Sequence, residues 1–170
     1  MSIKDFNIST DKILSLSAIV IAIVSISVAV WEGLETRKHN RLSVRPKLEI
    51  YYSTNKSKFG YVVVNNGLGP AVITGKKIFI DGKEITYTGF SGYDDFLEKL
   101  GLADRYAAHG VITPGFTIKA GKSENIILFD LYESDEAETL LPEIYRRVAI
   151  EIEYKSMYDE IFTCRIPSNN

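Results

Sequence analysis

The sequence is poor in the residues that most enzymes and metal sites use. Its 170 residues include one cysteine, Cys164, and two histidines, His39 and His109, which lie far apart in the chain. A single cysteine excludes an internal disulfide, and the histidines do not form a zinc-binding pattern. Nucleophilic catalysis needs a base beside a serine or cysteine, for which the sequence offers few candidates. We therefore expect a protein that is not an enzyme and has no catalytic, cofactor-binding or metal-binding residues.

Positive charge is also scarce over most of the chain. Residues 1–47 carry seven Lys or Arg against four Asp or Glu, whereas residues 48–170 carry thirteen against eighteen. Nucleic-acid-binding domains usually present a basic face, so this acidic body argues against a nucleic-acid partner. A hydrophobic content of 45% and a charged content of 25% are typical of a folded globular chain and exclude a disordered one.

One long stretch lacks charge, glycine and proline altogether. It runs from Ile13 to Trp31, and its nineteen residues would form a helix of roughly 28 Å, close to the thickness of a bilayer core. The sequence therefore predicts a transmembrane helix at 13–31, preceded by an N-terminal leader at 1–12. A cleaved signal peptide is the alternative, because Ser27-Val28-Ala29 matches a small-x-small cleavage site. The neutral leader and the length of the apolar run argue against it.

Basic residues follow the apolar run and predict its orientation. Segment 32–45 is expected to form a basic juxtamembrane helix or linker that ends before Pro46. The positive-inside rule places this side, and the C-terminal domain, in the cytoplasm and the N-terminus outside. Domain placement outside the cell is the weaker alternative. The residues expected at the membrane surface are Trp31, Arg37, Lys38, Arg41 and Arg45.

Small residues recur on one side of the predicted membrane helix. Ala18, Ala22, Ser25 and Ala29 are spaced four, three and four positions apart, which places them in one stripe. Small side chains let two membrane helices approach closely, so we expect helix association through this stripe. Alanine and serine are also common in membrane spans without any such role.

Two short stretches resemble known proteins. The residues Arg37 to Pro46, followed by Leu48 and Ile50, resemble the junction in uncharacterised small bacterial single-pass membrane proteins that carry one helix and a β domain. The run from Asn66 to Ala71 resembles the N-x-G-x-G-P-A turn of many bacterial immunoglobulin-like domains. This resemblance implies an architecture but no activity and no catalytic residue.

Hydrophobic residues alternate with polar ones in the remaining chain, 46–170. Leu48 and Ile50 start a half-buried strand, and Asp81-Gly82 lies between two alternating runs, which is a strong hairpin signal. A turn is expected at Asn65-Asn66-Gly67, where Gly67 and Gly69 permit positive φ. The last expected hairpin joins strands near Val148–Tyr154 and Ile161–Ile166.

Two short helices interrupt the expected strands. Residues 94–102 would cover the core with Phe96, Leu97 and Leu100, and a helix starting at Ser134 or Asp135 would be kinked or ended by Pro142. We therefore predict a mainly β protein: an N-terminal transmembrane helix followed by an immunoglobulin-like β-sandwich with one or two short helices. The alternative is a small β-barrel.

These features predict a membrane-anchored, non-enzymatic binding or scaffold module at the inner face of a bacterial membrane. Its expected partners are the lipid bilayer and either further copies of the chain or a membrane-associated protein. The alternative is a membrane effector gated by a small-molecule ligand such as a nucleotide, which perturbs the bilayer in defence or stress response. An anionic ligand would use surface cations and a loop histidine, namely Arg105, His109, Arg146 and Arg147.

Overall fold

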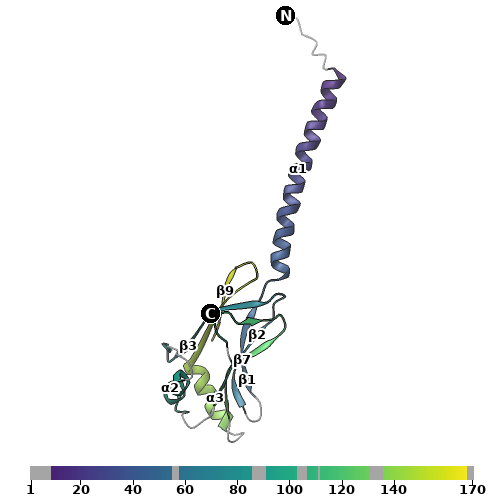
Figure 1. Ribbon diagram of the computed structural model, residues 1–170. Coiled ribbons are helices and arrows are strands. Elements are labelled where there is room, and N and C mark those ends of the chain that lie inside the picture. Colours follow the sequence, from purple (N-terminus) through teal and green to yellow (C-terminus); the bar gives the residue numbers. More distant parts are fainter. Residues whose placement is uncertain are drawn as a thin grey trace, which may run out of the picture. The chain divides into compact units, whose positions relative to one another are not determined.

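The computed structural model describes residues 9–54, 58–85, 91–102, 107–110, 112–130 and 136–167 (Figure 1). The chain divides into two units, Met1–Leu42 and Ser43–Asn170. The first contains one long helix, and the second contains antiparallel strands with two short helices. A mostly β protein with an N-terminal apolar helix, as the sequence predicts, is therefore confirmed.

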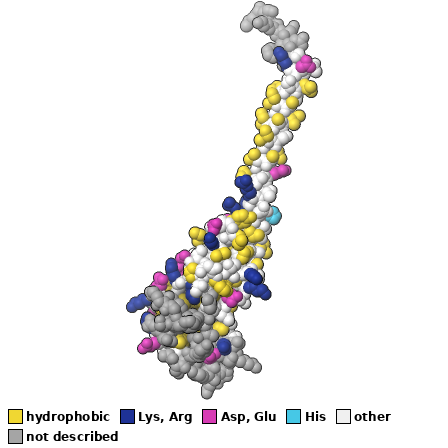
Figure 2. Space-filling model, viewed as in Figure 1, with side chains coloured by type: hydrophobic (Ala, Val, Ile, Leu, Met, Phe, Trp, Pro, Cys, Tyr) yellow, Lys and Arg dark blue, Asp and Glu magenta, His cyan; other side chains and the backbone are white. Residues whose placement is uncertain are grey.

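Helix α1 spans Thr10–Ser43, which is 34 residues or about 51 Å. It extends well beyond the predicted span and ends before Pro46, whose ring disfavours helical backbone in the residue before it. All its side chains are exposed, and Figure 2 shows hydrophobic groups along the face in view. Four serine hydroxyls donate to carbonyl oxygens one turn earlier at 2.5–2.9 Å, those of Ser15, Ser17, Ser25 and Ser27. These polar groups therefore need no water.

The strands form two sheets in which every pairing is antiparallel. The first has the order β1-β2-β7-β5. The second has the order β4-β3-β8-β9, with β6 pairing to β3. The bounds are β1 Leu48–Thr54, β2 Lys58–Asn65, β3 Ala71–Ile80, β4 Lys83–Ile85, β5 Ala107–His109, β6 Thr117–Ile118, β7 Ser123–Asp130, β8 Val148–Lys155 and β9 Ile161–Ile166. Among the described strands no pairing joins the two sheets into a closed barrel.

The core lies where the alternating residues of both sheets point inward. Strand β8 buries every second residue, and β2 contributes Phe59, Tyr61 and Val63, all with no exposed surface. Inward-facing residues belong to one continuous hydrophobic cluster, which also takes in half-buried side chains of β9. The period of two seen in the sequence therefore corresponds to burial, as expected for strands with one covered face.

The predicted hairpin at Asp81-Gly82 is confirmed. Strands β3 and β4 pair on either side of it, with Ile80 opposite Lys83. Asp81 and Gly82 both have positive φ, at 50° and 77°, which is the backbone that a two-residue hairpin turn requires. The terminal hairpin of β8 and β9 is also confirmed by its continuous register from Lys155 and Ile161 onward.

Both short helices pack on the core through their apolar residues. Helix α2, Ser91–Leu100, buries Phe96, Leu97 and Leu100 as predicted. Helix α3, Glu136–Arg147, contains Pro142 and continues for five residues beyond it, so of the two expected effects of this proline, a kink or an end, the end does not occur. Its second half is held by packing, because Ile144 is buried in the core and tertiary contacts override local propensity. The predicted capping residues lie outside the described part of the chain.

One local expectation is corrected, because His109, expected in a loop, lies in strand β5 opposite Ile127. Gly67 and Gly69 permit positive φ but do not adopt it. They are required by close packing instead, because a Cβ at Gly67 would collide with the backbone of Lys47, and one at Gly69 with the carbonyl group of Val44.

Candidate functional site

The predicted association stripe lies entirely on α1. Ala18, Ala22, Ser25 and Ala29 fall within about 60° around the helix axis, and all four side chains are exposed. The hydroxyl of Ser25 donates to the carbonyl oxygen of Ile21 at 2.8 Å, so the only polar side chain of the stripe is satisfied within its own helix. The stripe therefore presents a flat surface of small side chains.

The basic residues predicted at the membrane surface divide between the two units. Arg37, Lys38 and Arg41 lie in the last two turns of α1 and are exposed. Lys38 is 3.9 Å from Glu35, an exposed pair of the kind that contributes little to stability. Arg45 instead follows the end of α1, and its guanidinium carbon lies 4.8 Å from the centre of the Phe162 ring in β9. Arg45 therefore belongs to the folded domain.

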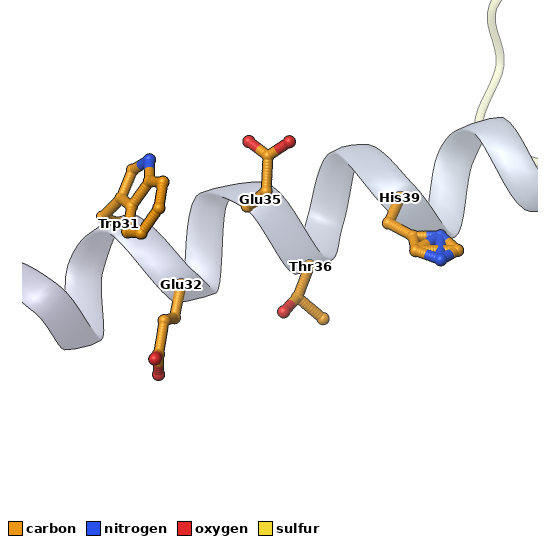
Figure 3. Close-up of a pocket in the computed structure, with 5 residues that line it drawn as sticks. All are labelled: Trp31, Glu32, Glu35, Thr36 and His39. Atoms are coloured by element: carbon orange, nitrogen blue, oxygen red, sulfur yellow. The ribbon is translucent and has the colours of Figure 1, made fainter.

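A shallow depression on α1 is formed by Trp31, Glu32, Glu35, Thr36 and His39. Figure 3 shows that all five side chains leave a single helix and spread outward rather than toward one point. A depression with no wall from a second element cannot enclose a small molecule. His39 has no second described ligand beside it, and the described residues contain no group of three potential metal ligands.

Asn65 lies at the end of the domain where the chain enters from α1, and its side chain bonds to several loops there. It has no exposed surface, and its amide group makes four hydrogen bonds. Its Nδ2 donates to the carbonyl oxygens of Gly69 and Ile118 at 2.8 and 3.0 Å. Its Oδ1 accepts from the backbone nitrogens of Lys47 and Gly67 at 3.2 and 3.0 Å. One buried side chain therefore fastens three backbone segments together.

The sequence pattern predicts only a turn in this region. The turn motif that begins at Asn66 starts one residue after Asn65, the asparagine that makes the buried bonds. Asn66 is exposed, and its side chain bonds to Glu49 and Tyr51. The pattern Asn-Asn-Gly after an apolar run marks the position, but only tertiary structure distinguishes the two asparagines.

A small polar network lies on the outer face of β1. The carboxylate of Glu49 is 2.6 Å from Nζ of Lys47, and it also accepts hydrogen bonds from Tyr51 and Asn66. The hydrogen bond from Lys47, followed by those from Tyr51 and Asn66, lowers the pKa of Glu49 to about 2. This network is exposed and forms no cavity, so it is a feature of the strand surface rather than a catalytic site.

Of the four candidate anion-binding residues, the structure describes the side chains of Arg146 and Arg147. Arg105 lies outside the described residues, and His109 is on β5 of the first sheet. Arg147 is already engaged, because its guanidinium group donates to both carboxylate oxygens of Asp81 at 3.0–3.2 Å and to the carbonyl of Lys99 at 3.0 Å. Arg147 therefore ties α3 to the β3–β4 hairpin and to α2, whereas Arg146 is exposed.

Three tyrosines form a cluster that the sequence did not reveal. The ring centres of Tyr52 and Tyr145 are 3.8 Å apart, and Tyr61 contacts both rings edge-on at 5.3 and 5.8 Å. The hydroxyl of Tyr61 is buried and has no hydrogen-bond partner in the described part of the molecule. Burial raises the pKa of Tyr61 far above its usual value. Through this cluster, strands β1 and β2 pack against helix α3.

Cys164 lies on β9 and is half-buried against the core. Burial raises the pKa of its thiol to about 12, so the reactive thiolate is nearly absent at neutral pH.

The comparisons with known proteins leave the family open. The sequence matches no protein-family model and no curated protein. One solved structure with some similarity is the archaellum periplasmic stator protein FlaG from Sulfolobus acidocaldarius. It is 14% identical, the match covers 71% of this chain and 97% of that one, and the TM-score is 0.31.

Proposed function

We propose that the chain is a membrane-anchored, non-enzymatic module whose β domain binds or organises a partner at the inner face of a bacterial membrane. Helix α1 is the observation that carries this proposal. It is long and apolar enough to cross a bilayer, and no part of its apolar window is buried by the protein. Large apolar side chains exposed in this way need lipid or another helix around them, because water would drive aggregation.

The proposed β domain is an immunoglobulin-like sandwich. The strand order supports this, because β1-β2-β7-β5 follows the pattern A-B-E-D and β4-β3-β8-β9 follows C′-C-F-G. Such sandwiches serve many binding and scaffold functions, so the fold names no activity by itself. The same architecture supports grouping the chain with the bacterial single-pass proteins that its juxtamembrane segment resembles.

The proposed orientation has the N-terminus outside and the β domain in the cytoplasm. Its support is the set of basic residues in the last turns of α1, which the positive-inside rule places on the cytoplasmic side. A test uses the chain with Cys164→Ser and one added cysteine, either Lys83→Cys in the domain or Ser2→Cys in the leader. A membrane-impermeant maleimide should label Ser2→Cys in intact cells and Lys83→Cys only after permeabilisation. The reverse pattern would place the domain outside.

The proposed module associates through the small-residue stripe of α1. Cysteine cross-linking in native membranes tests this, with Ala22→Cys on the stripe and Ser27→Cys as a matched control about 140° away on the same helix. We expect cross-linked dimers for Ala22→Cys and few for Ser27→Cys. Equal cross-linking at both positions would show random collision, and none at either would remove the support for self-association and leave a different protein as the partner.

The ligand-gated alternative has less support from the described geometry. Of its four candidate residues, Arg147 is held by Asp81, and Arg105 lies outside the described residues. A panel of nucleotides in a thermal-shift assay would show a raised melting temperature if this alternative held.

A further inference from the structure

The chain enters the β domain from α1 at one end of the domain, which we call the entry end, and several loops lie at this end. Strand β1 begins there at Leu48, opposite the last residue of β2, Asn65. Strand β3 also begins there, with Val72 opposite Lys155 at the end of β8, and the β8–β9 turn follows. The loop before β7 joins them through hydrogen bonds between Asn65 and residues 121–122. Helices α2 and α3 lie at the opposite end of the domain (Figure 1).

Exposed hydrophobic side chains are concentrated at this entry end. Within the described residues of 43–170, six large hydrophobic side chains are exposed, and four of them are here. We define the loop-tip patch as these four, with exposed fractions of 73% for Leu68, 63% for Met157, 47% for Tyr158 and 75% for Ile161. Figure 2 shows hydrophobic side chains gathered on this part of the domain. Leu68, Met157 and Tyr158 lie in turns and Ile161 begins β9, and side chains this exposed add little to the core, so an external contact accounts for them best.

The same end is positively charged although residues 48–170 are net acidic. Segments 44–48, 65–70, 119–122 and 155–161 contain five cations, Arg45, Lys47, Lys119, Lys122 and Lys155, against two carboxylates, Asp159 and Glu160. Lys155 pairs with Asp159 at 2.6 Å and Lys47 with Glu49 at 2.6 Å. Three cations then remain, Arg45, Lys119 and Lys122, against the one carboxylate of Glu160, so the excess is two positive charges. Apolar tips flanked by cations match the chemistry of an anionic lipid surface.

We infer that the loop-tip patch rests in the headgroup layer of the anionic bilayer that α1 crosses. This inference rests on the proposed function, because it requires the anchor. Residues 32–43 add a rise of about 18 Å beyond the apolar run, and this length limits how far the end of α1 lies from the hydrocarbon core. A tethered patch experiences a millimolar effective concentration of lipid surface, so a few apolar tips and cations suffice for contact.

Lipid-quenching of a fluorescent label tests this contact in the full-length chain. The chain carries Cys164→Ser and one labelled cysteine, and is reconstituted in phosphatidylcholine vesicles containing about one phosphatidylglycerol in three, with nitroxide-labelled lipid as the quencher. The test positions are Leu68→Cys and Ile161→Cys in the patch. Lys83→Cys, at the β3–β4 turn of the opposite end, is the matched exposed control. Ile21→Cys in α1 reports whether the anchor is inserted.

We expect quenching at Leu68→Cys and Ile161→Cys, no quenching at Lys83→Cys, and weaker quenching at the patch when phosphatidylglycerol is omitted. Replacing Lys119 and Lys122 with glutamine should lower the contact equilibrium about 30-fold, the equivalent of about 1 kcal/mol for each cation near the surface. Ile21→Cys should be quenched in every case.

Three outcomes would overturn the inference. Patch labels that are no more quenched than Lys83→Cys, while Ile21→Cys is quenched, would show that the anchor inserts but the patch stays in water. If the fluorescence of the patch labels changes with the protein-to-lipid ratio but is not quenched by the nitroxide lipid, the patch contacts a second copy of the chain instead. An unquenched Ile21→Cys would refute the anchor itself, and the inference with it.

Discussion

The buried amide of Asn65 gives the sharpest prediction about how the domain is held together. Replacing Asn65 with alanine removes four hydrogen bonds, those with Lys47, Gly67, Gly69 and Ile118, at a position with no exposed surface. Each bond contributes about 1 kcal/mol net, so the variant should lose about 4 kcal/mol of the free energy of unfolding. That is a large share of the 5–15 kcal/mol typical of a domain.

The matched control is Asn66→Ala, one residue along the chain. Its side chain is exposed and bonds only to the exposed network around Glu49, so we expect a loss of about 1 kcal/mol or less. A third variant, Asn65→Asp, keeps the acceptor but presents a buried oxygen to the carbonyls of Gly69 and Ile118. It should be at least as unstable as Asn65→Ala.

Pulse proteolysis over a urea series measures these differences on the full-length chain in lipid nanodiscs, because cleavage reports the folded fraction of the domain. With a urea dependence of about 2 kcal/mol per molar, the midpoint of Asn65→Ala should fall by about 2 M and that of Asn66→Ala by about 0.5 M or less. Equal midpoints for the two alanine variants would refute the central role of the buried amide.

Three further predictions concern single sites. Gly69→Ala should lower the free energy of unfolding by about 2 kcal/mol or more, since its new Cβ must displace the carbonyl of Val44; an unchanged urea midpoint would contradict this. Tyr61→Phe should be neutral or stabilising by up to about 1 kcal/mol in the same assay, because the lost hydroxyl is buried without a partner, and a clear destabilisation would mean that this hydroxyl is bonded. By NMR, the carboxyl of Glu49 should titrate with a pKa of about 2, and Lys47→Ala should raise that pKa toward 4.5. Since the folded pKa is depressed, the stability contributed by this network is present above pH 4.5 and lost as the pH falls toward 2. An ordinary pKa for Glu49 in the unmodified chain would contradict the network.

Much of the architecture follows from local patterns in the sequence. An uncharged run from Ile13 to Trp31 predicts a helix, because in lipid a single segment can satisfy its backbone hydrogen bonds only as a helix. Helix α1 includes this run. The alternation of Ile150 and Ile152 predicts strand β8, and Asp81-Gly82 predicts a turn because both residues tolerate positive φ.

Other features depend on contacts between distant parts of the chain and left no local signal. Gly69 reads as a turn residue with free backbone, yet it is needed because Val44 packs against it from a segment 25 positions earlier. Pro142 predicts a kink or an end of the helix, yet the helix continues beyond it because Ile144 is buried in the core. The patch offered a weak signal, since Leu68 and Met157 are large apolar residues inside turns, where polar residues are usual.

The most direct measurement of the central claim is the intact mass of the chain that stays in membranes after alkaline carbonate extraction. A helix that spans the bilayer resists this treatment, so we predict that the extracted membranes retain a chain of 19.1 kDa that still includes α1. Recovery of the chain in the aqueous fraction, or of a product that begins after Ala29, would contradict the anchor and every proposal that depends on it.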